Sequence, residues 1–369
     1  TTVSRRAAGL SPLEMAQDLA SKPDNDWQDL MFGPALMQNY ALSVKGGGKY
    51  STYYNSVGYT NQDGVMKGTN YQRYTLQSKQ DFKKGIFQAE TNVVLTYDQS
   101  NPLYSVIRGG MVGHTLQAIP TWEQYDENRT GGYGGLYGDV VNLTHPLGMV
   151  DDNLMKRYSD NVKIFANAYV SVELMKGLKY KLNLTPDFQF YRYNSYEGLF
   201  DFGLAKHDIT AVTEQQTRTR NILVENLLTF DRTFGDHKVS ALVGYTYQDS
   251  RYRYMQGSGQ GMPTGITEID AASQGLAVSG NSSRSVLTSI LGRAFYSYKN
   301  RYLLTATIRR DGSSKFGSNY RYGNFPSVSV GWNIAEEDFV KNSVSWLDQL
   351  KLRGGYGVLG NQEIDNYQY

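Results

Sequence analysis

Hydrophobic and polar residues alternate along most of the chain after residue 37, and the stretch from Arg301 to Ile334 shows this pattern most clearly. A period of two is that of a β-strand, whose successive side chains point to opposite faces of a sheet. After a polar loop, the alternation resumes from Pro326 to Trp332 and predicts a second, neighbouring strand. In the first strand, mostly apolar positions alternate with mostly polar ones: Tyr302, Leu304, Ala306 and Ile308 against Leu303, Thr305, Thr307 and Arg309.

The same period predicts about twelve strands in all. Most of them reach the roughly 9–11 residues that a transmembrane β-strand needs. The predicted strands are 38–45, 49–60, 71–82, 86–98, 161–175, 178–193, 218–232, 237–253, 285–299, 301–311, 324–334 and 348–358.

The connections between these strands alternate between short and long, with a modest link at 61–70 and a helical one at 335–346 as exceptions. The short connections are 46–48, 83–85, 176–177, 235–236 and 299–300, and the long ones are about 99–160, 194–217, 254–284 and 312–323. Outer-membrane barrels have short turns at one end and long loops at the other, whereas a soluble sandwich has no reason to sort its loops. The sequence therefore predicts an all-β fold, an antiparallel transmembrane β-barrel.

Residues 1–37 are the least strand-like part of the chain. Ser11 followed by Glu14 is typical of a capping box, which predicts a short helix through about Ala20. The stretch 25–32 predicts another helical turn.

The composition fits a barrel that faces lipid on one side and water on the other. Hydrophobic residues make up 40% of the chain and the mean hydropathy is −0.50, as expected when half of each strand lines a polar interior. The 30 tyrosines outnumber the 14 phenylalanines, as expected for aromatic girdles at two membrane–water interfaces. The net charge of +2, with both signs interspersed, gives no indication of nucleic-acid binding.

No catalytic, metal or cofactor motif stands out. The chain has no cysteine, and its four histidines (His114, His145, His207 and His237) lack ligand spacing. No GxSxG motif occurs, and the glycine-rich stretch 131–138 is not a phosphate-binding loop. We therefore expect a protein that is not an enzyme and needs neither a metal ion nor a cofactor.

The loop 99–160 is the most suggestive functional stretch, because it combines aromatic rings with carboxylates among glycines. Such groups bind a sugar ring or a peptide by stacking and hydrogen bonding. Equally, they pack a loop on itself or against a partner, and the sequence alone leaves both alternatives open. The candidate substrate contacts are Trp122, Tyr125, Asp126, Tyr133, Tyr137 and Asp139.

Several stretches resemble the SusC/RagA family of TonB-dependent outer-membrane transporters. The strongest is YLLTATIRRDGSSKFG followed by GNFPSVSVGW, between Arg301 and Trp332. NDWQDL at 25–30, MQNY at 37–40 and LKLRGGYGVLGNQ from Leu350 are similar to the family as well, and in its order.

The resemblance implies a fold, a domain layout and a function. It implies a barrel of about 22 strands, of which about twelve lie in residues 38–369, with 1–37 a connector that follows an absent plug domain. It implies multi-pass insertion in the outer membrane lipid and TonB-dependent import of a nutrient, an oligosaccharide first and an oligopeptide second. The implied partners are a SusD-like surface lipoprotein and the TonB complex, which acts through the absent plug region.

Charged side chains on the inner face of the predicted barrel are candidates for contacts with the plug or for structural networks. By alternation they include Glu225, Asp231, Arg309 and Asp311. Two alternatives to the transporter remain at this point: a self-contained outer-membrane barrel enzyme of about twelve strands, such as a lipid hydrolase, and a soluble β-rich adhesin.

Overall fold

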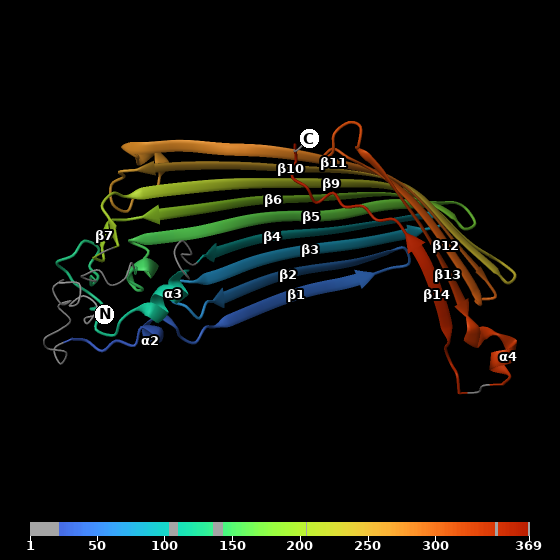
Figure 1. Cartoon of the computed structure of the whole chain (residues 1–369), viewed down its shortest axis with the longest axis horizontal. Coiled ribbons are helices and arrows are strands. Elements are labelled where there is room, and N and C mark those ends of the chain that lie inside the picture. The colour runs from blue at the N-terminus through green and yellow to red at the C-terminus, as the bar shows by residue number, and fades with distance from the viewer. Residues whose placement is uncertain (1–21, 103–109, 136–142, 204, 344–345, 368–369) are drawn as a thin grey trace, which may run out of the picture.

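A single antiparallel sheet of twelve strands dominates the computed structural model, which describes residues 22–102, 110–135, 143–203, 205–343 and 346–367 (Figure 1). The strands are hydrogen-bonded in chain order. They are β1 (Met37–Gly47), β2 (Ser51–Asp63), β3 (Asn70–Lys84), β4 (Phe87–Asn101), β5 (Met155–Met175), β6 (Leu178–Glu197), β9 (Ala211–Phe234), β10 (His237–Gln260), β11 (Gln274–Tyr298), β12 (Tyr302–Ser313), β13 (Tyr322–Asn333) and β14 (Lys351–Gly357). A separate pair, β7 (Phe200–Asp201) and β8 (Lys206–His207), lies in a loop.

The described helices are short. The helical turns expected at 25–32 and 335–346 are confirmed by α2 (Trp27–Met31) and by the 3₁₀ turn η4 (Ile334–Glu336) with α4 (Asp338–Lys341). The sequence did not predict α3 (Gly110–Gln117) or the turns η2 (Gly148–Val150) and η3 (Ile269–Ala271). The helix expected at 11–20 lies outside the described residues. No helix in the described part of the chain is long and apolar enough to cross a membrane.

The twelve predicted strands are confirmed in number and order, but several are longer than expected. Strands β9, β10 and β11 have 24, 24 and 25 residues. They extend into the expected loops 194–217 and 254–284, because backbone pairing continues through residues that show no hydrophobic alternation, such as 213–220 of β9. The short turns lie at one end of the sheet, the turn end, together with the helical link between β13 and β14, and the other long connections lie at the opposite end, the loop end.

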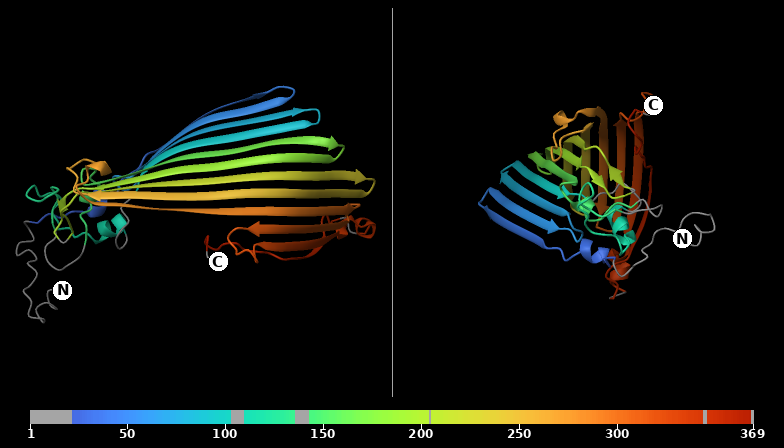
Figure 2. Two further views of the ribbon diagram at one scale, coloured as in Figure 1. Left: turned by 90° about the horizontal axis from the view of Figure 1, so that it is seen from above. Right: turned by 90° about the vertical axis from the view of Figure 1, so that its left-hand side faces the viewer.

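The sheet curves into an arch, which the end-on view of Figure 2 shows. Within the described residues, β1 and β14 are the two edges and do not pair with each other. Strands β12 to β14 are shorter than β9 to β11 and begin or end near the turn end.

The cross-strand register sorts the side chains onto two faces. On one of them, Leu42 lies opposite Val57, Val57 opposite Leu76, and Leu76 opposite Leu95. We call this side the apolar face and the other the polar face. Exposed members of the apolar face are Leu42, Val57, Leu76, Leu95, Val170, Leu182, Leu184, Leu228, Val243, Ile290, Leu304, Ile308, Val328 and Val330. Contiguous exposed apolar surface of this extent indicates contact with lipid or protein.

Aromatic rows border the apolar face. Near the loop end, Tyr40, Tyr59, Tyr74 and Tyr97 form a line across β1 to β4, with neighbouring ring centroids 6.4, 4.9 and 6.3 Å apart. Rings with one polar atom suit the boundary between hydrocarbon and water. The expected tyrosine girdle thus has a structural counterpart on the predicted face.

A buried carboxylate organises the aromatic residues of the turn end. Glu337, which is 7% exposed, accepts hydrogen bonds from the Trp332 indole at 2.9 Å and from the Tyr302 hydroxyl at 2.7 Å, and its carboxylate pairs with Arg301 at 3.1 Å. The Trp332 and Tyr302 hydrogen bonds hold the pKa of Glu337 below its ordinary value. The link between β13 and β14 is therefore tied to the ends of β12 and β13.

The two faces predict opposite responses to an added charge. Val243, which is 59% exposed in the half of β10 nearer the turn end, lies on the apolar face, and Thr246 lies on the polar face of the same strand. We expect Val243→Arg to lower the free energy of unfolding in lipid vesicles by about 2–4 kcal/mol, the cost of a buried arginine near the bilayer midplane. Thr246→Arg, the matched control, should cost much less. Urea unfolding of both variants measures the difference, and equal losses would contradict the assignment of the faces.

Candidate functional site

The long connections at the loop end fold into a compact unit with its own hydrophobic core. This loop-end cap comprises residues 24–33, 64–69, 110–135, 143–154 and 198–207 apart from 204 (Figure 1). Its core is a cluster of twelve buried hydrophobic side chains, eleven from the cap and Met155 from the start of β5: Trp27, Met31, Met66, Met111, Trp122, Leu143, Leu147, Met149, Leu154, Met155, Phe200 and Phe202. The cap is therefore held together by burial, independently of the exposed apolar face of the sheet.

The stretch 25–30 anchors the cap. Asp26 caps α2 by accepting from the backbone N–H groups of Gln28 and Asp29. The Trp27 indole donates to the Ile119 carbonyl at 2.8 Å, while the Asn25 amide donates to the Trp122 carbonyl at 2.6 Å. These hydrogen bonds join residues that lie about a hundred positions apart in the sequence. The stretch 25–30 therefore holds two distant parts of the cap together.

His145 lies at the centre of the cap, fully buried among aromatic rings. The ring centroids of Trp122, Trp27, Tyr133 and Phe202 lie 4.7, 5.1, 5.1 and 5.6 Å from that of His145. Its Nδ1 accepts from the Gly148 N–H, so Nε2 carries the proton and donates to the Glu123 carbonyl at 3.2 Å. Burial lowers the pKa of His145 to about 4, and the imidazole is neutral at pH 7.

Glycines allow the cap to close. A Cβ atom at Gly134 would lie 2.1 Å from the Glu123 carbonyl oxygen, and one at Gly148 would lie 2.5 Å from the Phe202 ring. The glycine-rich stretch 131–138 thus serves close packing in its described part, 131–135, as expected for a loop rather than for a phosphate site.

The structure separates the candidate contacts of loop 99–160 into two groups. Trp122 is 2% exposed, and Tyr133 is half-buried and donates to Asp151 at 2.9 Å. Both pack the loop on itself, which is the second of the two alternatives left open by the sequence. Burial and hydrogen bonding to Asp151 raise the pKa of the Tyr133 hydroxyl.

Tyr125 and Asp126 are the candidates that reach the surface of the cap. Tyr125 is 62% exposed, and its ring lies over Tyr133 at a centroid distance of 5.4 Å. Asp126 accepts from the backbone N–H of Asn128 and pairs with Arg129 at 3.4 Å, so its carboxylate is already engaged. Tyr137 and Asp139 lie outside the described residues.

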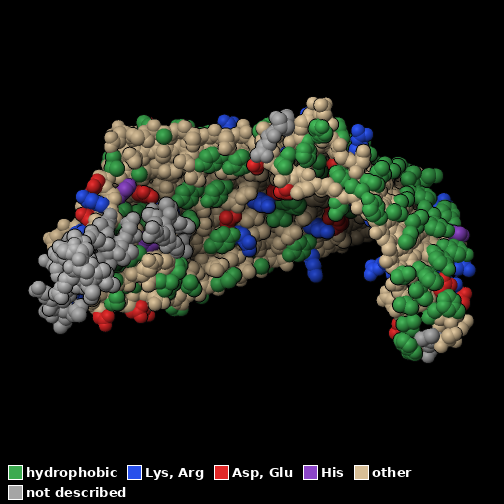
Figure 3. Space-filling model, viewed as in Figure 1, with side chains coloured by type: hydrophobic (Ala, Val, Ile, Leu, Met, Phe, Trp, Pro, Cys, Tyr) green, Lys and Arg blue, Asp and Glu red, His purple; other side chains and the backbone are tan. Residues whose placement is uncertain are grey.

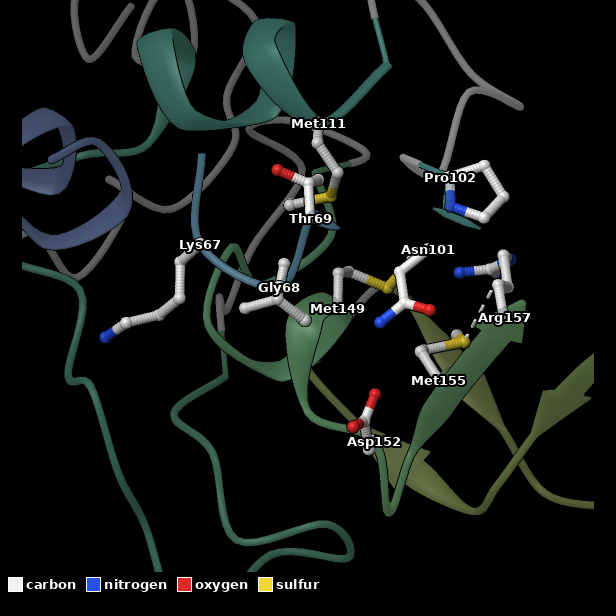
Figure 4. A pocket seen from close by; sticks show the side chains of 11 residues that line it. Lys67, Gly68, Thr69, Asn101, Pro102, Met111, Met149, Asp152, Met155 and Arg157 are labelled. Carbon is white, nitrogen blue, oxygen red and sulfur yellow. Dashed lines mark hydrogen bonds between the residues drawn. The ribbon is translucent and has the colours of Figure 1, made fainter. Parts of the chain in front are cut away.

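A narrow cavity lies where the cap meets the ends of β3, β4 and β5 (Figure 4). Met111, Met149 and Met155 are among the residues that line it, and Arg157, which also lines it, pairs with Glu197 at 3.3 Å. Flexible methionines fill irregular gaps between packed units. The cavity therefore belongs to the joint between cap and sheet.

The four candidates for the barrel interior all lie on the polar face. Glu225 accepts from the Asn183 amide at 2.9 Å. Arg309 pairs with Asp311 at 2.6 Å and donates to Ser289 at 3.0 Å, while Asp231 lies exposed near the turn end. Figure 3 shows charged side chains of both signs on the concave middle of the sheet and mostly hydrophobic ones on the outer side of β12 to β14.

A larger polar network on the same face escaped the sequence analysis. The Tyr169 hydroxyl accepts from Gln88 at 2.9 Å and donates to Glu90 at 3.4 Å, and Lys181 lies 3.7 Å above the Tyr169 ring. Lys79 also pairs with Glu90 at 3.4 Å. Alternation places each residue on the polar face, but only the register between β3, β4, β5 and β6 brings them together.

The described residues contain no group of three or more histidines and carboxylates placed to hold a metal ion. The site is instead a pair of surfaces: an aromatic, partly acidic cap and a hydrogen-bonded polar wall.

No protein-family model matches the chain. Among curated proteins, TonB-dependent receptor P3 of Formosa agariphila is 30% identical over 364 residues, which cover 94% of this chain and 35% of the relative. TonB-dependent receptor SusC of Bacteroides thetaiotaomicron is 28% identical over 375 residues, which cover 94% of this chain and 36% of SusC. The chain thus spans about a third of the length of these relatives.

Among solved structures, the RagAB peptide importer in its open-open state has a TM-score of 0.82 at 20% identity, covering 99% of this chain and 44% of that one. The fold is therefore that of a barrel segment of this type, and the resemblance to the SusC/RagA family is confirmed. The sequence relatives are named as receptors, which supports the expectation that the chain is not an enzyme.

The buried histidine predicts a pH-dependent cap. His145 has a folded pKa of about 4 against about 6.5 when exposed, so between these values the open cap binds more protons than the closed one. The stability of the cap should therefore fall as the pH drops from 6.5 to 4, by up to about 3 kcal/mol. The stability of the cap is measured by urea titrations at several pH values, with tryptophan fluorescence as the signal of unfolding.

His145→Gln should remove that pH dependence, because glutamine does not titrate. His207→Gln is the matched control, since His207 belongs to the same cap but is more exposed and close to Glu197. An unchanged slope in His145→Gln would refute the role of His145.

Proposed function

We propose that this chain, which is related to TonB-dependent receptors including SusC, forms part of an outer-membrane barrel that imports a nutrient in a TonB-dependent manner. The observation that carries the proposal is the sorting of side chains by the register: exposed apolar residues gather on one face and hydrogen-bonded polar residues on the other. A wall with these two faces separates lipid from an aqueous interior.

The proposal assigns a position in the membrane to each part. The apolar face contacts lipid, the turn end faces the periplasm and the loop end faces the outside, as in other barrels with short periplasmic turns. Residues 38–369 then belong to the barrel, and 1–37 connect it to a plug domain. In this arrangement the polar face, with Glu225, Asp231, Arg309 and Asp311, contacts the plug or lines the path of the cargo.

We propose an oligosaccharide as the first candidate cargo and an oligopeptide as the second. An exposed aromatic ring such as that of Tyr125 suits stacking against the apolar face of a sugar ring. The structural relative RagAB is titled a peptide importer, which supports the second candidate. The proposed partner is a SusD-like surface lipoprotein that contacts the loop end.

Uptake by living cells tests the function. A strain lacking the gene should fail to grow on one class of oligosaccharide as sole carbon source, and deletion of its TonB should have the same effect. Affinity purification from native outer membranes should recover a surface lipoprotein with the protein. Normal growth of the mutant on every oligosaccharide, but not on oligopeptides, would select the second cargo, and normal growth on both would refute the proposal.

The cap contact is tested by substitution. Tyr125→Ala should weaken cargo binding by about three- to tenfold, the loss of one aromatic contact. Tyr320→Ala is the matched control, because Tyr320 is an exposed loop tyrosine, 82% accessible, between β12 and β13. The affinity of both variants for the cargo is measured by calorimetric titration of the purified complex. The ligand in this titration is the class of cargo that the growth experiment identifies. Equal binding by the two variants would remove Tyr125 from the site.

A further inference from the structure

An arginine patch lies on the apolar face near the loop end. The register places Arg218 of β9 opposite Arg253 of β10, and Arg220 opposite Arg251, which in turn faces Arg284 of β11. All five side chains are exposed. We call these five residues the arginine patch. They occupy two adjacent rows on three neighbouring strands and share the face of Leu228, Val243 and Ile290.

The patch is not neutralised by the protein. Directly opposed like charges destabilise a sheet, and the patch contains three such pairs. Asp249 is 6% exposed and pairs with Arg251 at 3.2 Å and Arg284 at 2.9 Å. Arg218, Arg220 and Arg253 form no ion pair with any described residue.

The neighbouring charges do not supply the missing counter-charge. Arg192 on β6 is already paired with Asp160 at 2.7 Å. Glu214 lies four residues from Arg218 on β9, toward the loop end, and forms no ion pair with any residue of the arginine patch. Within the patch, five positive charges therefore face one buried carboxylate, and this excess of positive charge attracts anions from outside the chain.

The position of the patch along the strands indicates where those anions lie. On β10, ten steps separate His237 at the turn end from Tyr247. Each residue advances the strand by about 3.4 Å. With a strand tilt of about 40°, these ten residues rise about 25 Å along the membrane normal, which is the height of the apolar band of an outer-membrane barrel. Arg251 and Arg253 follow directly beyond this band, on its lipid-facing side, at the depth of the lipid headgroups.

We propose that the arginine patch binds the phosphate groups of an anionic lipid of the outer leaflet. The planar guanidinium group donates paired hydrogen bonds that match phosphate oxygens. Several guanidinium groups side by side bind a headgroup with more than one phosphate. The apolar residues below the patch contact the acyl chains of the same lipid. Free phosphate lacks these chains, and an acidic protein would have to reach a face that lipid surrounds.

This proposal rests on the membrane orientation given under the proposed function, but not on the identity of the cargo. The hypothesis of lipid binding and the hypothesis of transport can therefore be refuted independently. The test uses the full protein purified in detergent, with bisphosphorylated lipid A as the probe and native mass spectrometry as the readout. Arg218→Gln/Arg220→Gln/Arg253→Gln should bind the probe on the order of 100-fold more weakly, because each basic group near an anionic surface contributes to binding.

A matched variant removes three positive charges from the polar face instead: Arg73→Gln/Lys181→Gln/Arg293→Gln. It should bind lipid A as the unmodified protein does. Equal weakening in both triple variants would overturn the proposal, since it would reveal a general charge effect. Inorganic pyrophosphate should compete poorly, and competition equal to that of lipid A would overturn the assignment to lipid.

Two further measurements keep the test decisive if the triple variant folds poorly. Arg218→Lys/Arg220→Lys/Arg253→Lys keeps the positive charges but removes the paired hydrogen bonds of the guanidinium groups, so this variant should retain part of the lipid A binding. In the unmodified protein, lipid A binding should weaken as sodium chloride screens the patch. Binding that is insensitive to both changes would overturn the proposal.

Discussion

The ladder of backbone hydrogen bonds that joins β1 to β14 in chain order is the constraint on which the rest of the structure depends. In hydrocarbon every buried peptide group needs a partner within the protein, and a paired sheet supplies it. Once the ladder is fixed, the period of two decides which side chains meet lipid and which meet water. The tyrosine row of β1 to β4, the network around Tyr169 and the arginine patch are three results of one register.

The fold was predictable because the alternation that specifies a strand is local. Strand number, order and the sorting of turns follow from the sequence, and the turns at 25–32 and 335–346 do as well. The strand ends were not predictable. In β9 the residues from Thr213 to Arg220 are polar on both faces, so the hydrophobic period vanishes while the hydrogen bonds continue. Hydrogen bonding depends on a neighbouring strand, which no window of one strand contains.

The candidate site was predictable only in part, because burial in the cap depends on distant residues. Trp122 is enclosed by Trp27 and His145, neither of which adjoins it in the sequence. The three tyrosines at the loop end of β6, Tyr191, Tyr193 and Tyr196, do not share one environment. Tyr191 and Tyr193 lie on the polar face, and Tyr196 is 1% exposed beneath Met262. Residue type alone does not distinguish a ring that stacks on cargo from one that fills a core.

Cap and sheet obtain their stability from different sources. Among the residues that the structure describes, the buried hydrophobic ones lie in the cap, at the loop ends of strands and near α4, and none of them lies in the middle of a strand of the main sheet. The cap buries its apolar surface internally and gains free energy in water. The sheet leaves its own apolar surface exposed, so its gain comes from lipid and adjoining protein. The arginine patch lies where these two environments meet, and there an anion from the surroundings takes the place of a charged partner within the chain.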